Sequence, residues 1–181
     1  DAVLSRKILD EILNGLMLLC EESGWQLPSH NSYIRDTPQL PFPNSKRPVI
    51  DLFAAETGAL ISCAYALLKK ELDSIDEQIG KRIESELHTR IVEPYLNEHF
   101  WWMGSVDGEG DEPMCNWTPW CTQNILLVFF TLKLEEEKRF SALQKAAFSL
   151  DCFLKDYGED GACCEGVQYY SHAGLCLFNA V

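Results

Sequence analysis

The chain has few basic residues, and this shortage narrows the partners it can take. Its 181 residues include 15 Lys and Arg against 28 Asp and Glu, for a formal net charge of −13. Nucleic acid is disfavoured as a partner because neutralising phosphates needs a basic surface. Long-range repulsion would also slow the approach of a highly sulfated polyanion. A charged sugar stays compatible if local groups neutralise it, and a solvated acidic surface is the plain alternative.

Signal-peptide architecture and long apolar runs are also missing. We find no run of about 18 apolar residues and therefore expect no membrane span. The first residues read Asp-Ala-Val-Leu-Ser-Arg-Lys within a helical pattern, so we expect a cytoplasmic location. With 46% hydrophobic residues the chain is not disordered, and its length fits one domain over residues 1–181. Both ends interrupt helical patterns, which indicates a piece of a longer protein.

The eight cysteines contain no CxxC pair. Most lie in helical patterns beside Leu, Ile and Phe, as small buried residues of a reducing compartment do. A zinc ion could be ligated by Cys115, Cys163, Cys164 and His172, but two adjacent cysteines rarely ligate the same ion. We therefore expect neither a metal nor another cofactor.

Apolar residues recur at intervals of three and four almost throughout, and no period-two strand is visible. The fold class predicted is all-α. The six expected helices run from Leu4 to about Gly24, from Asp51 to Leu72, from Ile75 to Tyr95, from Thr118 to Leu132, from Glu137 to Tyr157, and from Glu165 to the end.

Details of these helices give further expectations. Apolar residues including Phe53, Leu60 and Leu67 should face inward on the second helix, where small residues permit close packing. Ser74 and Glu77 form a capping-box pattern before the third, and Pro94 should kink it. The fourth helix is apolar on nearly all faces, so it should be an inner helix.

Six helices in sequence form three antiparallel hairpins. Strongly apolar helices alternate with amphipathic ones, which favours an inner and an outer layer. Hairpins of this kind can curve into an α/α toroid, and three of them make only part of the ring. The expected architecture is an incomplete α/α toroid.

Two short stretches carry most of the chemistry. In Cys115–Trp120, the amide of Asn116 can donate to a carboxylate and accept from a hydroxyl, although an N-cap role is the bland alternative. Trp117 and Trp120 lie three apart and form either a platform for a sugar ring or part of the core. A long Pro-rich loop after residue 25 contributes His30, which is as much a candidate for the site as for a loop position.

The second stretch, Asp160–His172, opens the last expected helix. Glu165 suits the first turn of a helix, where the dipole favours an acid, and a chemical role is equally open. Tyr169 can transfer a proton if a nearby cation lowers its pKa, whereas a buried, hydrogen-bonded tyrosine is the commoner state. Tyr170 and His172 follow on the next residues of the same helix.

Taken in order, four blocks of the chain resemble the heparinase II/III-like family, and together they cover most of the sequence. They are Trp25–His30, Asp51–Thr57, Asn116–Cys121, and Asp160–Gly161 followed by Glu165–Gly166 and Tyr169–Tyr170. The resemblance implies an α/α toroid joined to a C-terminal β-sandwich, which this chain lacks. It also implies a polysaccharide lyase acting on uronate-containing polysaccharides or oligosaccharides. By itself, the chain is expected to be inactive or nearly so.

In the chemistry that the resemblance implies, an amide neutralises the uronate carboxylate, and Asn116 matches that residue. Tyr169 matches the base or acid, and His172 competes with it for the role. Substrate would then be bound by five further residues: His30, Trp117, Trp120, Glu165 and Tyr170.

Two other functions remain open. A glycosidase toroid would need two carboxylates about 5 to 10 Å apart, with Glu56, Asp160 and Glu165 as candidates. A non-catalytic glycan-binding module would use the aromatic residues alone. An incomplete ring should also expose apolar faces, so we expect self-association.

Overall fold

Helices dominate the computed structural model, which describes residues 2–31, 42–105, 114–155, 157–163 and 165–181. The protein is all-α and 75% helical, with no strand among these residues. The predicted fold class and the six helices are confirmed. Those of eleven or more residues are α1 (Ala2–Glu21), α2 (Leu52–Ile75), α3 (Glu77–Leu87), α5 (Trp117–Thr131), α6 (Glu136–Lys155) and α7 (Val167–Ala180).

The predicted third helix is a composite of three segments. After α3 the backbone widens into a π-helical turn, His88–Val92, and then continues as α4 (Glu93–Asn97). Pro94 lies in the first turn of α4, where its missing N–H interrupts the helical ladder. A π turn is one way for a helix to absorb such an interruption, so the expected disturbance falls just before Pro94.

The capping box predicted at Ser74 and Glu77 is wrong. Ser74 lies inside α2, where its hydroxyl donates back to the Glu71 carbonyl at 2.7 Å. The residue that caps α3 is Asp76, whose extended backbone lets its carboxylate accept from the Gln78 N–H at 2.8 Å.

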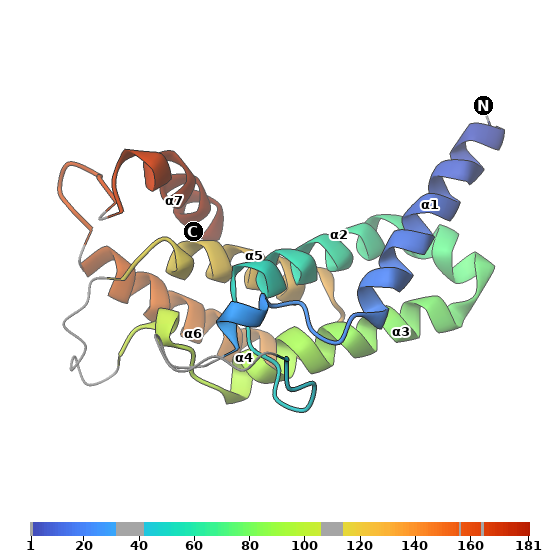
Figure 1. Cartoon of the computed structure of the whole chain (residues 1–181), viewed down its shortest axis with the longest axis horizontal. Helices are drawn as coiled ribbons and strands as arrows, with labels where there is room; N and C mark the ends of the chain where they lie inside the picture. The colour runs from blue at the N-terminus through green and yellow to red at the C-terminus, as the bar shows by residue number, and fades with distance from the viewer. Residues whose placement is uncertain (1, 32–41, 106–113, 156, 164) are drawn as a thin grey trace.

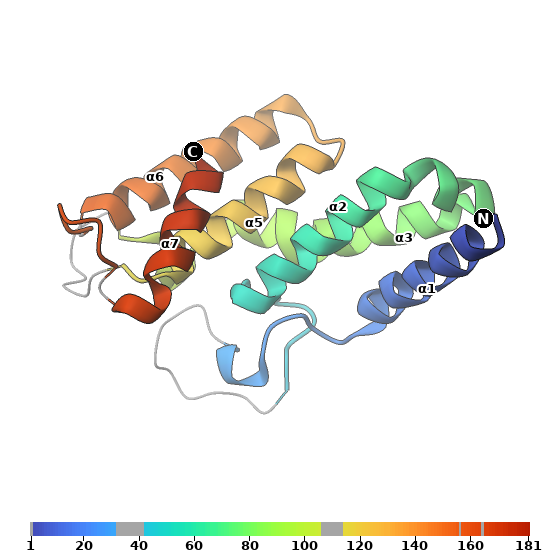
Figure 2. The same cartoon turned by 90° about the horizontal axis from the view of Figure 1, so that it is seen from above.

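The helices form two layers (Figure 1). On one side, α2 and α5 pack together along their lengths, and α7 packs against α5. On the other side, α3 packs under α2 and α6 under α5. In the view of Figure 2, α2 and α5 run in one direction while α3 and α6 run back in the other. The first turns of α2 and α5 therefore lie at the same end of this layer, and α7 lies across α5 on the side away from α6.

Small residues set the closeness of α2 to its neighbours, as predicted. A Cβ on Gly58 would lie 2.8 Å from Ile91 Cγ1 and 3.5 Å from Val128 Cγ2. On α5, Cys121, Ile125 and Val128 are fully buried. The expectation that this apolar helix is an inner one is confirmed.

The opposite stripe of α2 faces outward, which contradicts the prediction for two of its leucines. Leu60 is 62% exposed and Leu67 is 81% exposed. Because the small-residue face of α2 packs inside, the larger side chains on the other face stay largely exposed. Phe53, also predicted to face inward, lies on the same stripe and is exposed.

By length and composition, α2 could cross a membrane, with 39% of its most apolar 18-residue window buried in the protein. The window includes polar residues and is not an unbroken apolar run, so the expectation of no membrane span stays a prediction. Buried core helices of soluble proteins pass the same test.

Candidate functional site

A buried aspartate organises the start of the candidate site. Asp51 is the N-cap of α2 and is fully buried. One carboxylate oxygen accepts from the Ala54 N–H at 2.7 Å, and the other accepts from the Leu27 N–H at 3.0 Å. Burial raises the pKa of the Asp51 carboxyl, and these hydrogen bonds oppose the rise.

Asp51 also orients His30. The second carboxylate oxygen lies 2.7 Å from His30 Nδ1, at the end of the short 3₁₀ turn Pro28–His30. A proton on Nδ1 then faces the carboxylate, which leaves Nε2 to accept or donate at a ligand. The imidazole ring meets the Trp117 ring edge-on at 4.8 Å and stacks on Phe53 at 6.4 Å. His30 thus joins the candidate site through its ring contacts as well as its hydrogen bond to Asp51.

The Trp117 ring belongs to a wider aromatic group. It lies 4.8 Å from the ring of Trp101, which opens the 3₁₀ turn Trp101–Met103. Two hydrogen bonds hold that turn between α2 and α5: Trp102 Nε1 donates to the Ile50 carbonyl and Thr118 Oγ1 donates to the Trp102 carbonyl. The core of the protein therefore fixes where these indoles stand.

A single hydrogen bond joins the two stretches that the sequence singles out. The backbone N–H of Asn116, at the start of α5, donates to Glu165 Oε2 at 2.7 Å. Glu165 directly precedes Gly166, which is the N-cap of α7. The φ of Gly166 is 84°, in the left-handed region that favours glycine. The turns that open α5 and α7 therefore meet at one place.

The side chain of Asn116 does not cap its helix. The residue is buried and its side chain makes no capping hydrogen bond. Its amide oxygen has no hydrogen-bond partner among the described residues. An unpaired buried acceptor costs about 1–3 kcal/mol, so a ligand that donates to this oxygen gains that free energy back. Asn116 therefore occupies the N-cap or turn position considered as the alternative, but its side chain supplies no capping hydrogen bond there.

A row of polar side chains crosses the three neighbouring helices. Trp120 Nε1 on α5 donates to Glu56 Oε1 on α2 at 2.9 Å. On the other side, the Trp120 ring meets the ring of His172 on α7 at 3.9 Å between centroids. His172 Nε2 lies 3.5 Å from Cys176 Sγ. Burial raises the pKa of Cys176 to about 11, so Cys176 is a neutral thiol that can donate to the imidazole.

The two tyrosines of α7 occupy different faces. Tyr169 lies one turn before Ala173 and two before Cys176, both of which are buried, and its own side chain is exposed. A Cβ on Gly161 would lie 3.9 Å from the Tyr170 hydroxyl, which places Tyr170 beside the turn that precedes α7. Asp160 lies in that turn as well, where its carboxylate accepts from the Ala162 N–H.

Metal-binding geometry is absent from the part of the chain that the structure describes: no three His, Cys, Asp or Glu side chains gather there. Of the cysteines considered for zinc, Cys115 and Cys163 are buried. Cys164, the remaining member of the zinc set considered from the sequence, lies outside the described residues.

Sequence reasoning missed two contributors and misplaced a third. Asp51 has the position of an N-cap before an apolar helix, a signal that was readable. Trp101 is part of an aromatic run without a distinguishing pattern. Glu56 entered only as a glycosidase carboxylate, because nothing in its spacing shows that it meets Trp120 from a helix 64 residues away.

Comparison with known proteins adds no assignment: no family model matches the chain, and no curated protein matches it either.

Proposed function

We propose that this site belongs to a polysaccharide lyase that cleaves uronate-containing glycans by β-elimination. The observation that carries the proposal is the hydrogen bond between Asn116 N–H and Glu165, because it joins the amide turn to the turn that leads to Tyr169. Trp117 and Trp120 flank that junction, and indole faces suit the apolar faces of a pyranose ring.

The proposed scaffold is part of an α/α toroid of the heparinase II/III-like kind. Support comes from the alternation of the chain between layers, with α2 and α5 parallel in one and α3 and α6 in the other. In such a ring the first turns of successive inner helices line up. The row from Glu56 through Trp120 to His172 follows that line.

Asn116 is the proposed partner of the uronate carboxyl group. Its amide can donate to one carboxyl oxygen, and its unpaired oxygen can accept from a hydroxyl or from the protonated acid. Reducing the negative charge on the carboxyl makes the C5 proton more acidic. This interaction strengthens as charge develops toward the transition state, which is where binding lowers the barrier.

Tyr169 or His172 then removes the C5 proton. The C5–H electron pair becomes the C4–C5 double bond, the C4–O bond breaks, and an acid protonates the leaving oxygen. His172 is oriented by Trp120 and Cys176, whereas Tyr169 is exposed on the same stripe of α7. His30, held by Asp51, is placed to bind substrate hydroxyls beside Trp117.

The test is ultraviolet absorbance of unsaturated uronate, measured with the full natural protein on a panel of uronate polysaccharides. Asn116→Ala should abolish most turnover, and loss of the base should cost about 10²- to 10⁴-fold in kcat. Comparing Tyr169→Phe with His172→Ala identifies the base. Tyr157→Phe is the matched control, since Tyr157 packs on Phe153 of α6. Unchanged turnover in both Asn116→Ala and Tyr169→Phe would refute the proposal.

A glycoside hydrolase is the second candidate, and one arrangement favours it. Glu56 and Glu165 both accept from N–H groups at the start of α5, from Trp120 and Asn116 respectively. A pair of carboxylates is what glycoside hydrolysis requires. New reducing ends without any unsaturated product, lost in Glu56→Gln and Glu165→Gln, would identify this activity instead.

A further inference from the structure

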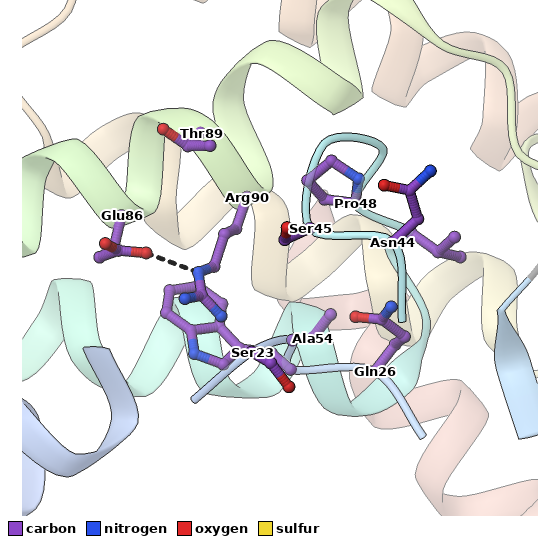
Figure 3. A pocket seen from close by; sticks show the side chains of 12 residues that line it. Ser23, Gln26, Asn44, Ser45, Pro48, Ala54, Glu86, Thr89 and Arg90 are labelled. Carbon is purple, nitrogen blue, oxygen red and sulfur yellow. Dashed lines mark hydrogen bonds and ion pairs between the residues drawn. The ribbon is translucent and has the colours of Figure 1, made fainter. Parts of the chain in front are cut away.

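A separate cavity of about 180 Å³ lies beside the start of α2 (Figure 3). Three segments enclose it: residues 23–26 after α1, residues 44–49 before α2, and residues 86–90 at the end of α3. None of its lining residues belongs to the site around Asn116. The cavity is smaller than the roughly 300–1,000 Å³ of drug-sized sites, yet far larger than the roughly 10–15 Å³ that one water needs.

Arg90 is the cation of this cavity. Its Nε donates to Glu86 Oε2 at 2.6 Å, the pair that Figure 3 draws, and Nη2 donates to the Glu22 carbonyl at 2.6 Å. The guanidinium lies over the Trp25 ring, 4.8 Å from its centroid. Its remaining nitrogen, Nη1, is buried and has no hydrogen-bond partner among the described residues. A buried charged donor without an acceptor is unfavourable, so Arg90 is one acceptor short.

The charge around the cavity favours an anion. Glu86 accepts from Arg82 Nε at 2.9 Å as well as from Arg90, so two guanidinium groups share one carboxylate. Among the described residues, Glu86 and Arg90 are the ionisable groups that line the cavity, and Arg82 pairs with Glu86 from outside it. Because Glu86 is shared between two guanidinium groups, it neutralises Arg90 only in part.

The neutral polar lining adds hydrogen-bonding capacity. Ser23, Ser45 and Thr89 supply hydroxyl groups, and Gln26 and Asn44 supply amides. Gln26 is itself buried, with its Nε2 donating to Asn31 Oδ1 at 2.7 Å, so its carbonyl position is fixed. Groups of this kind match hydroxyls on a ligand better than an apolar surface does.

We propose that this cavity binds a small organic carboxylate that also carries hydroxyl groups. The ligand's carboxylate pairs with the Arg90 guanidinium, which lines the cavity, and its hydroxyls bond to the serine, threonine and amide groups opposite. The proposal stands on the cavity alone and does not depend on the lyase chemistry proposed for Asn116.

Saturation-transfer NMR with D-glucuronate, D-glucose and acetate as separate probes tests the idea. Glucuronate has about 13 non-hydrogen atoms, which at about 0.3 kcal/mol per atom corresponds to a Kd on the order of 1 mM. Glucose lacks the carboxylate and acetate lacks the hydroxyls, so both should bind at least about tenfold more weakly. Arg90→Gln should weaken glucuronate binding by a similar factor.

Arg82→Gln is the matched control. Arg82 pairs with the same Glu86 and likewise donates to a carbonyl at the end of α1, that of Cys20, but it does not line the cavity. Its replacement should leave glucuronate binding unchanged within about twofold. Ser45→Phe, on the exposed rim, fills the cavity and should abolish binding even if Arg90→Gln does not fold.

Three results would overturn the proposal. They are equal binding of glucose and glucuronate, no glucuronate binding at tens of millimolar, and equal damage from Arg82→Gln and Arg90→Gln in folded proteins. Selective glucuronate binding that Ser45→Phe or Arg90→Gln removes supports it.

Discussion

Removal of the Asp51 carboxylate should destabilise the protein through several named contacts. Asp51→Ala deletes the N-cap of α2, which is worth about 0.5–2 kcal/mol. It leaves the Leu27 N–H without its acceptor, at about 1 kcal/mol, and removes a bond to His30 worth about 1.5 kcal/mol. Relief of carboxylate burial offsets part of this loss, because burial is the dominant influence on its pKa. We expect a net loss of about 3 kcal/mol.

For a chain of 181 residues, that loss lowers Tm by about 6–12 °C. Urea unfolding followed by circular dichroism gives the free energies. Asp76→Ala is the matched control, because Asp76 caps α3 in the same way but is exposed and caps without a histidine partner. It should cost only about 1 kcal/mol.

A double-mutant cycle isolates the contact between the two side chains. With Asp51→Ala, His30→Ala and the double variant, the coupling energy should be about 1–2 kcal/mol. If the free-energy losses of the two single variants add within about 0.5 kcal/mol, Asp51 does not orient His30. The assignment of the imidazole proton to Nδ1 would then be wrong.

The pH dependence gives an independent check on Asp51. Because burial raises its folded-state pKa, the folded protein holds this proton more tightly than the unfolded chain does. The associated stability is fully present below the unfolded-state value of about 3.9 and is lost as pH rises through the folded-state pKa. The stability of wild type relative to Asp51→Asn should therefore fall with rising pH over that window. A flat difference between the two proteins would contradict burial as the cause.

Two further predictions concern packing. Gly58→Ala should destabilise by about 1–3 kcal/mol in urea unfolding, since its Cβ would meet Ile91, whereas Gly15→Ala, with nothing within 4 Å, should stabilise by about 0.5–1 kcal/mol. The reverse order would mean that α2 is not packed as described. We also expect concentration-dependent self-association in sedimentation velocity, reduced in Leu60→Lys/Leu67→Lys with stability unchanged within about 0.5 kcal/mol. If the wild-type protein stays monomeric at high concentration, the exposed leucines do not form an interface.

Much of the fold could be read from local pattern. The second helix was expected from Asp51 to Leu72 and runs Leu52–Ile75, because apolar residues at intervals of three and four mark a helix. The inward prediction for Leu60 and Leu67 failed because α2 has two apolar faces. Periodicity identifies each face but does not say which one packs; the small side chain of Gly58 decides that by allowing close approach.

The candidate site divides in the same way. Residue type alone identified five residues of the candidate site, because few structural roles explain amide, indole, acid and imidazole side chains together at helix starts. They are Asn116, Trp117, Trp120, Glu165 and His172. Their partners were not identifiable, because a side chain's type says nothing about what a distant turn brings to it. That Asn116 N–H meets Glu165 from 49 residues away follows from helix packing alone.

From the sequence by itself came the helices, their order and the polar turns that open them, because backbone hydrogen bonding and short-range periodicity are local. The tertiary structure alone decided that Asp51 holds His30, that Trp120 lies between Glu56 and His172, and that Arg90 lines a cavity. These contacts depend on how helices pack in three dimensions, and that packing is set by the shapes of side chains far apart in the chain.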